Sequence, residues 1–255
     1  MLNVRVIPCL DVKDGRVVKG IRFANLADQG EPARLARRYE REGADEIVIL
    51  DVSATEDGRL ARAGTIGRVR DEISIPLTVG GGVRTVEDAG TLLEAGADRV
   101  AVNTAAVERP SLLEEISMRF GAQCAVLALD ATGAPADECP SGFEVLTYSG
   151  RKRTGRDAAA WARRAVELGA GEILLTSFDR DGTRSGYDLD LIATIRGAVP
   201  VPIVASGGGA HPGHMCAAVG AGADAVLAAS IFHQEEWSIG RLKDRLQQLG
   251  VAVRR

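Results

Sequence analysis

Two aspartates stand at the ends of apolar segments, where a buried strand has no packing use for a carboxylate. Asp11 follows the apolar run 4–10, and Asp130 closes the run 124–130. Carboxylates on opposite sides of a reacting carbon skeleton can serve as general acid and general base. The alternative is that each side chain caps its own loop by an Asx-type turn. Lys19 follows Asp11 in the chain, and it either neutralises developing negative charge or is a solvated loop lysine.

Glycine-rich stretches follow other apolar runs and indicate phosphate binding. ASGGG (205–209) and AAS (228–230) come after the seventh and eighth runs, and Ser230 adds a hydroxyl. Glycines let backbone N–H groups approach an anion closely, although a single pair of glycines can also simply form a tight turn. The pattern recurs earlier in the chain, which predicts a second phosphate site. Its candidate residues are Gly82, Asn103 and Thr104.

Two longer segments offer further polar groups. The segment 143–155 has the pattern of a small hairpin lid, and its Ser149 and basic residues are expected to cover a phosphorylated ligand. The segment 176–188 offers side chains for ligand hydroxyls. The candidates in that segment are Asp179, Asp181 and Thr183. No metal or cofactor is expected, because His211 and His214 have no third ligand at a suitable spacing.

Eight short aliphatic runs must position these residues. They do not alternate apolar with polar residues, which is typical of parallel strands covered on both faces. Helix-like segments separate them, and most of these end in Gly-Ala. This alternation over 255 residues predicts a single (β/α)8 barrel, whose active site lies at the carboxyl ends of the strands. The runs are 4–10, 46–50, 75–79, 99–103, 124–130, 172–177, 201–206 and 224–230.

The two halves of the chain repeat each other. GADEIVIL matches GAGEILLT, and AGADRVAVNT matches AGADAVLAAS, each at an offset of 126 residues. We therefore expect one domain over residues 1–255, an α/β barrel with internal two-fold duplication and half-barrels at about 1–122 and 123–255. The two phosphate sites then lie opposite each other across the mouth, so the ligand should carry a phosphate at each end. The two aspartates face its middle.

The composition excludes several classes of function. The net charge is −4, so no face for nucleic acid is expected. No segment approaches the roughly 20 apolar residues that a membrane span needs. The four cysteines have no ligand-like spacing, and we interpret them as reduced thiols of a cytosolic protein.

Charged residues also stand at the amino-terminal ends of four runs. Two cations and two anions there could form a ring that closes the bottom of the barrel, or they could be ordinary rim charges. The four residues are Arg5, Glu46, Arg99 and Glu172. Composition alone does not decide between the two interpretations.

Together these motifs resemble the family of cyclase subunits of imidazole-glycerol-phosphate synthase, of histidine biosynthesis. The resemblance covers essentially the whole chain and rests on CLDVKDGRVVKG, TVGGG, NTAAVE, TYSGRKRTG, LLTSFDRDGTRSGYD and AASIFH. It implies a lyase reaction in which ammonia reaches the ketone carbon of phosphoribulosyl-formimino-aminoimidazole carboxamide ribonucleotide. The implied products are imidazole glycerol phosphate and aminoimidazole carboxamide ribonucleotide.

The resemblance also implies roles for individual residues. Asp11 and Asp130 match the acid–base pair of the family, and Lys19 matches the lysine that assists it. The matching phosphate contacts are Gly82, Asn103 and Thr104 on one side, and Asp181, Gly182, Gly208, Ala229 and Ser230 on the other.

A separate glutaminase subunit is the implied partner, forming a heterodimer at the amino-terminal face of the barrel. Ammonia passes from it through the barrel interior, and Asp98 and Gln123 match positions near that interface. The charged gate on this route matches Arg5, Glu46, Arg99 and Glu172. The chain departs from the family pattern at Arg99, which replaces a gate lysine and has a planar, less adaptable head. It also departs at His211, which replaces a lysine after the seventh run.

Two alternatives stay open. The sister isomerase of the same pathway is also a duplicated barrel with two aspartates and two phosphate sites, but it would turn over without a nitrogen donor. The strings around Lys19, Ser149 and Asp181 favour the cyclase. A non-catalytic barrel that binds a partner and phosphorylated metabolites is the second alternative, and the presence of both aspartates and both phosphate sites speaks against it.

Overall fold

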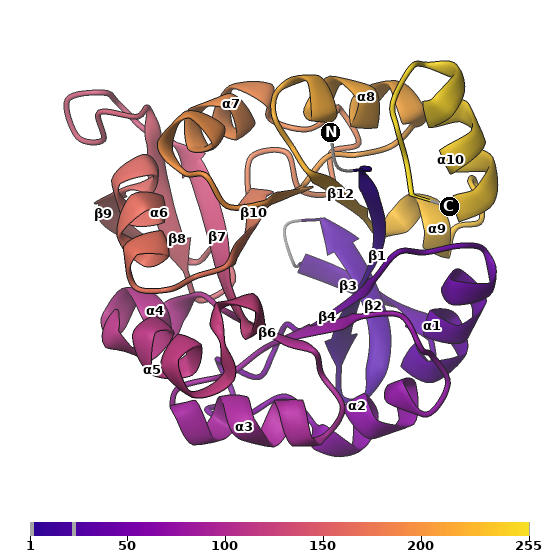
Figure 1. Ribbon diagram of the computed structural model, residues 1–255, viewed down its shortest axis with the longest axis horizontal. Coiled ribbons are helices and arrows are strands. Elements are labelled where there is room, and N and C mark those ends of the chain that lie inside the picture. The colour runs from indigo at the N-terminus through magenta and orange to yellow at the C-terminus, as the bar shows by residue number, and fades with distance from the viewer. Residues whose placement is uncertain (1–2, 22–23, 255) are drawn as a thin grey trace.

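A closed ring of parallel strands forms the centre of the molecule, with helices around it (Figure 1). The computed structural model describes residues 3–21 and 24–254, and the side chains of residues 19–27 lie outside that description. Within it, the strands of the ring are, in order, β1 (Arg5–Lys13), β4 (Ile47–Asp51), β5 (Leu77–Gly80), β6 (Arg99–Val102), β7 (Ala125–Gly133), β10 (Glu172–Ser177), β11 (Ile203–Ser206) and β12 (Ala225–Ala228). β7 pairs with β10 and β12 pairs with β1, so the ring has no open edge. The predicted (β/α)8 barrel is confirmed.

Amphipathic helices cover the outside of the ring. They are α1 (Pro32–Arg41), α2 (Ala63–Arg70), α3 (Val86–Glu94), α4 (Thr104–Glu108), α5 (Ser111–Phe120), α6 (Ala158–Glu167), α7 (Leu189–Ala198), α8 (Pro212–Gly220), α9 (Ser230–His233) and α10 (Ile239–Gln248), with the 3-10 turn η1 (Ala122–Cys124). Local signals start several of them. Thr85 forms a capping box with Asp88, and the Asp157 and Asp188 side chains cap α6 and α7. None of the described helices is both long and apolar enough to cross a membrane.

Two strands of the ring are longer than expected, and each carries a hairpin. β1 and β7 continue past Asp11 and Asp130 to Lys13 and Gly133, because their ends pair in antiparallel fashion with a following strand. The two hairpins consist of β2 (Arg16–Ile21) with β3 (Ala24–Gly30), and β8 (Phe143–Thr147) with β9 (Lys152–Asp157). The expected hairpin at 143–155 is therefore confirmed, whereas Lys19 lies in β2 and not in a loop. The boundary between half-barrels at 122 and 123 stays a prediction.

The strands bury apolar side chains on both faces, as their sequences predict. The outward faces pack against the helices, and the inward faces form a separate apolar cluster inside the ring. Along β1 the inward positions alternate, so Arg5, Ile7, Cys9 and Asp11 share one face. The inner cluster consists of Ile7, Cys9, Val48, Ala101, Val126, Leu174, Val204, Ala225, Leu227 and Ala229. It separates charged residues at the amino end of the ring from polar residues at the mouth.

A buried ion pair joins the last helix to the first strand. The Lys243 Nζ on α10 lies 2.8 Å from Asp45 Oδ2, and both side chains are 5% exposed. The same oxygen accepts a 2.7 Å hydrogen bond from the backbone N–H of Val6 in β1. Asp45 therefore connects both ends of the chain just before β4 begins.

We predict that Lys243→Met lowers the free energy of unfolding by about 3 kcal/mol, because it leaves the Asp45 carboxylate buried without its cation. Urea denaturation measures the effect. Arg164→Met is the matched control, since Arg164 pairs with Glu167 on the exposed face of α6, and it should cost no more than about 0.5 kcal/mol. Equal losses in the two variants would contradict the structural role of the buried pair.

Candidate active site at the carboxyl ends of the strands

A single cavity lies at the carboxyl ends of the strands and contains most of the residues singled out in the sequence. Its lining includes residues from all eight strand ends and from the turn of the β8–β9 hairpin. The expected residues that it brings together are Asp11, Gly82, Asn103, Thr104, Asp130, Ser149, Asp181, Gly182, Gly208, Ala229 and Ser230. The side chain of Lys19 lies outside the described part of the structure, so its role stays a prediction.

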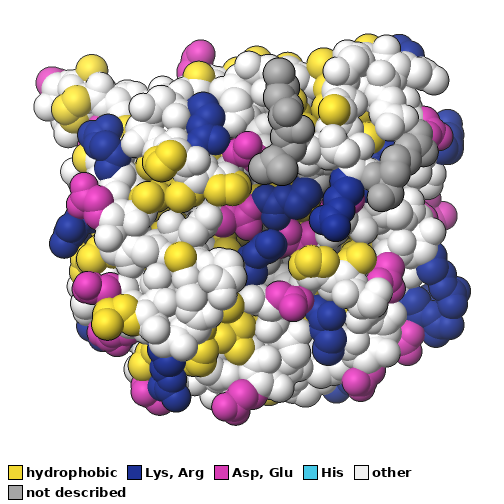
Figure 2. Space-filling model, in the orientation of Figure 1, with side chains coloured by type: hydrophobic (Ala, Val, Ile, Leu, Met, Phe, Trp, Pro, Cys, Tyr) yellow, Lys and Arg dark blue, Asp and Glu magenta, His cyan; other side chains and the backbone are white. Residues whose placement is uncertain are grey.

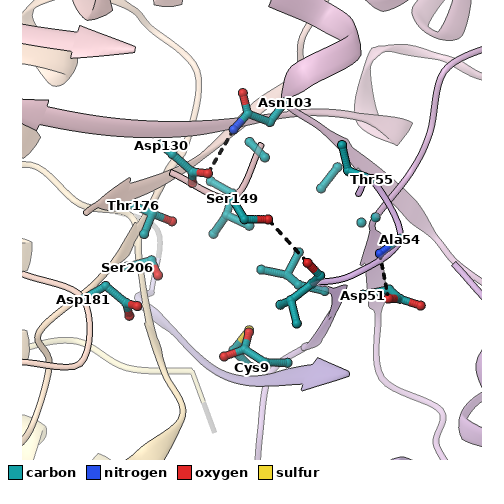
Figure 3. Close-up of a pocket in the computed structure, with 18 of the residues that line it drawn as sticks. Cys9, Asp51, Ala54, Thr55, Asn103, Asp130, Ser149, Thr176, Asp181 and Ser206 are labelled. Carbon is teal, nitrogen blue, oxygen red and sulfur yellow. Dashed lines mark hydrogen bonds between the residues drawn. The ribbon is translucent and has the colours of Figure 1, made fainter. Parts of the chain in front are cut away.

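The two aspartates come from strands that are opposite in the ring. Asp11 of β1 is buried, and its Oδ1 lies 3.5 Å from the thiol of Cys9. Asp130 of β7 accepts a 2.9 Å hydrogen bond from Asn103 Nδ2, which also donates to the carbonyl of Leu146. Figure 3 shows Asp130 and Asn103 on one side of the cavity, with Asp51 across from them. These contacts of Asp11 and Asp130 are not those of an Asx-type turn.

The environment of Asp130 makes it suitable for proton transfer near neutral pH. The pKa of Asp130 is raised to about 7, mainly by burial and also by the negative charge of Asp181, and this value includes the opposing effect of hydrogen bonds from Asn103 and Thr176. Thr176 lies directly beside Asp130 in the pairing of β10 with β7. A carboxyl group with a pKa near the working pH can hold or release a proton during a reaction.

Glycines at two equivalent places in the cavity lining could not be replaced without a backbone clash. Gly82 has a φ of 70°, and a Cβ atom there would lie 1.8 Å from the carbonyl oxygen of Arg59. Gly208 has a φ of 89°, and its Cβ would lie 2.2 Å from the carbonyl oxygen of Gly186. Both conformations favour glycine. The two glycines are 126 residues apart, so each half of the barrel contributes one such turn.

The turn of the β8–β9 hairpin lies against the cavity. Tyr148, Ser149 and Gly150 all have positive φ angles, which bend the chain sharply. The hydroxyl of Ser149 points across the cavity toward the carbonyl oxygen of Val52, at 3.5 Å (Figure 3). The backbone N–H of Tyr148 donates to Thr104 Oγ1 at 3.0 Å. The hairpin thus contacts residues of the first expected phosphate site.

At the opposite end of the ring, the four charged residues expected there meet one another. Arg5 and Arg99 each lie 2.7 Å from Glu46, and Arg5 also pairs with Glu172. Figure 2 shows Arg or Lys and acidic side chains gathered at the centre of this face. Glu46 and Glu172 are only 2% and 8% exposed, so the interpretation as ordinary rim charges is wrong.

The two expected interface residues lie near this ring and differ in their contacts. Asp98 accepts hydrogen bonds from Arg70 at 2.9 Å and from the backbone N–H of Leu77 at 2.8 Å. Gln123 is exposed and lines a surface depression together with Arg5, Arg99 and Glu172.

Sequence reasoning missed several residues of the cavity, among them Asp51, Arg59, Thr176 and Ser206. Asp51 follows the apolar run IVIL and could have been found by the signal that identified Asp11. Two expectations are corrected, because neither Asp179 nor Thr183 lines the cavity. The Asp179 carboxylate accepts hydrogen bonds from Thr132 and from the backbone of Gly133. The Thr183 hydroxyl donates to the carbonyl of Arg180 at 2.7 Å.

The rings of His211 and His214 lie against each other, tilted by 37° with their centroids 3.8 Å apart, and each accepts a hydrogen bond from a nearby backbone N–H. These contacts give both side chains a structural role around the start of α8. Among the described residues, no group of three or more His, Cys, Asp or Glu side chains is placed to hold a metal ion.

Comparisons with known proteins show which family this chain is similar to. The model of a family described as histidine biosynthesis protein matches residues 5–238. The chain is 56% identical to imidazole glycerol phosphate synthase subunit HisF of Corynebacterium urealyticum, with 97% of each chain covered. It is 54% identical to the subunit of the same name from Mycobacterium tuberculosis, covering 99% of this chain and 96% of the relative. The subunit HisF of Salinispora arenicola is 56% identical, with 99% of each chain covered.

We predict that Asp130→Asn stabilises the fold in a pH-dependent way. Between about pH 4 and pH 7 the folded chain holds a proton at Asp130 that the unfolded chain has released, so stability falls as the pH rises through this window. Removing the carboxylate should therefore raise the free energy of unfolding at pH 8 by on the order of 2 kcal/mol more than at pH 4. Urea denaturation at both pH values measures the difference.

Asp14→Asn is the control, because Asp14 is an exposed residue that pairs with Arg62 outside the cavity. Its effect on the free energy of unfolding should be nearly the same at pH 4 and pH 8. If Asp130→Asn also has the same effect at both values, the raised pKa of Asp130 is contradicted.

Proposed function

The chain belongs to the histidine biosynthesis protein family, and we propose that its cavity carries out the cyclase reaction of imidazole glycerol phosphate synthase. In this proposal the chain is the cyclase subunit of that synthase, and the reaction is that of a lyase. The single observation that supports the chemistry best is the cavity itself, in which aspartates from opposite strands lie between two equivalent glycine turns.

The substrate, phosphoribulosyl-formimino-aminoimidazole carboxamide ribonucleotide, lies across the mouth of the barrel. One phosphate is held by Gly82, Asn103 and Thr104. The other is held by Asp181, Gly182, Gly208, Ala229 and Ser230. Backbone N–H groups provide the contacts at the glycines, because glycine has no side chain to keep an anion away from the backbone. Ser149 of the hairpin covers the ligand from above the cavity.

Asp11 and Asp130 act on the middle of the substrate. Ammonia adds to the ketone carbon, and loss of water gives an imine, for which the leaving oxygen must receive a proton. We assign this proton to Asp130, because its pKa of about 7 leaves it partly protonated near neutral pH. The nitrogen that came from ammonia then attacks the formimino carbon to close the ring, and Asp11 is the base that removes its proton. The C–N bond from that carbon to the aminoimidazole carboxamide breaks, and the departing amine takes up a proton. Lys19 assists by neutralising negative charge. The products are imidazole glycerol phosphate and aminoimidazole carboxamide ribonucleotide.

Ammonia comes from a glutaminase subunit that docks on the amino-terminal face. The relatives are named as subunits, which supports a complex of this kind. The ring of Arg5, Glu46, Arg99 and Glu172 then acts as a gate, and the small apolar side chains of the inner cluster form the path to the mouth. Asp98 and Gln123 lie near the docking surface. The four cysteines, all of them in the described part of the chain, form no disulfide, which suits a cytoplasmic enzyme.

We predict that Asp11→Asn and Asp130→Asn each lower kcat/KM with ammonium salt by at least about 100-fold, because each removes a proton-transfer group. Product formation from the bisphosphate substrate measures the loss. Asp14→Asn, outside the cavity, should retain activity. Full activity of both cavity variants would contradict the acid–base assignment, and turnover without any nitrogen donor would instead indicate an isomerase.

We predict that Gln123→Trp lowers glutamine-driven turnover by about tenfold, because a bulky side chain at the proposed interface obstructs docking of the partner. Ammonium-driven turnover does not need the partner and should be maintained. Arg164→Trp, on the exposed face of α6, is the matched control and should affect neither rate. If Gln123→Trp leaves glutamine-driven turnover intact, the docking surface lies elsewhere.

A further inference from the structure

An ion pair that sequence reasoning missed borders the first glycine turn. Asp51 is the last residue of β4, and its side chain is 3% exposed. Both guanidinium ends of Arg59 bind this carboxylate, at 2.6 Å for Nη1 to Oδ2 and 3.0 Å for Nη2 to Oδ1. Arg59 Nη2 also donates to Ser53 Oγ at 2.7 Å. A two-point contact of this kind fixes both position and orientation of the arginine.

The Asp51–Arg59 pair joins the two ends of the loop 52–62. The backbone of this loop packs against the glycine turn. The carbonyl oxygen of Arg59 packs so closely on Gly82 that a Cβ atom at position 82 would lie 1.8 Å from it. The backbone N–H of Ala61 donates to the carbonyl of Gly81 at 3.0 Å. The loop is therefore the outer wall of the first anion cradle, by which we mean the turn Gly81–Gly82 with Asn103 and Thr104.

The same loop contacts the hairpin that covers the cavity. Ser149 Oγ donates to the carbonyl of Val52, the residue directly after Asp51, at 3.5 Å. Arg151 in the hairpin turn pairs with Glu56 at 2.6 Å. The loop thus contacts both the glycine turn and the hairpin, so a displacement of the loop would shift both.

In the second half of the barrel an uncharged residue takes the place of Asp51. Ser177 lies 126 residues after Asp51, and its hydroxyl donates to Asp188 at 3.0 Å. There the carbonyl of Gly186 packs on Gly208, as the carbonyl of Arg59 packs on Gly82. The Asp51 carboxylate therefore has no counterpart at the equivalent position 177, and the second cradle is a control within the same molecule.

We propose that the Asp51–Arg59 pair is a positioning device for the first anion cradle, and that it acts on substrate binding through the backbone of loop 52–62. Arg59 is then a positioning residue whose charge is used by Asp51 and not by a phosphate of the ligand. This inference rests on the proposed function, since it assigns one phosphate end of the substrate to the first cradle.

A titration with inorganic phosphate tests the proposal directly. The backbone amide NMR signals of Gly82 and Gly208 report binding at the first and the second cradle separately. In Arg59→Gln, phosphate affinity at Gly82 should fall by about tenfold, because a small displacement of a binding group has a large cost. The affinity at Gly208 should stay unchanged. Arg59→Lys keeps the charge but not the two-point contact, so it should restore only part of the loss.

Asp51→Asn distinguishes positioning from direct binding. Under the proposal it releases the loop and weakens phosphate at Gly82, although Arg59 keeps its full charge. If Arg59 is instead a phosphate ligand, Asp51→Asn frees it and phosphate binds more tightly at Gly82. That result, or equal losses at Gly82 and Gly208, would overturn the inference. Thermal melting of each variant verifies that the chain is folded before it is titrated.

Kinetics with ammonium salt separate this inference from the proposed function. Arg59→Gln should raise KM for the bisphosphate substrate by about tenfold with a much smaller change in kcat. Arg62→Gln is the control in the same loop, because Arg62 pairs with the exposed Asp14 and lies outside the cavity. If the unmodified protein forms no product, the proposed function fails, whereas the phosphate titration still decides the role of the ion pair.

Discussion

Closure of the parallel ring is the constraint on which the rest of the structure depends. Because β12 pairs with β1 and β7 with β10, every strand of the ring ends at the same mouth. Residues far apart in the chain, such as Asp11, Asp130 and Asp181, therefore line one cavity. The two-residue period of each strand adds the second restriction, since it sends alternate side chains inward. Arg5 and Asp11 therefore both point into the ring from β1, with Arg5 at its amino end and Asp11 at its mouth.

Much of this arrangement follows from the sequence, and the reasons are local. Apolar runs identify the strands of the ring, and the residues after them identify the mouth, which is why the glycine turns and both aspartates were found. The internal repeat places equivalent residues opposite each other. The meeting of Arg5, Arg99, Glu46 and Glu172 was expected as one of two arrangements, and only the burial of the two glutamates decides for the ring.

Other features depend on contacts that no short pattern encodes. The extensions of β1 and β7 arise from antiparallel pairing with hairpins, which continues each strand beyond its aspartate. The Asp51–Arg59 pair joins residues across a loop whose shape is set by the glycine turn beneath it. The protonation of Asp130 depends on burial and on Asp181, which comes from the loop after β10. Each of these is a property of the folded chain and not of a segment.

The charge arrangement along the barrel axis has a consequence for what can travel through it. Two arginines and two glutamates balance one another at the amino end, and an apolar cluster follows directly behind them. An ammonium ion on this route would lose most of its hydration and find no net negative charge to replace it, whereas uncharged ammonia crosses at little cost. On the proposed route the interior is thus a filter that passes a base and rejects its conjugate acid. On this route ammonium must therefore lose a proton to become ammonia before it enters the barrel. Ammonia can be protonated again only at the mouth, beside the aspartates.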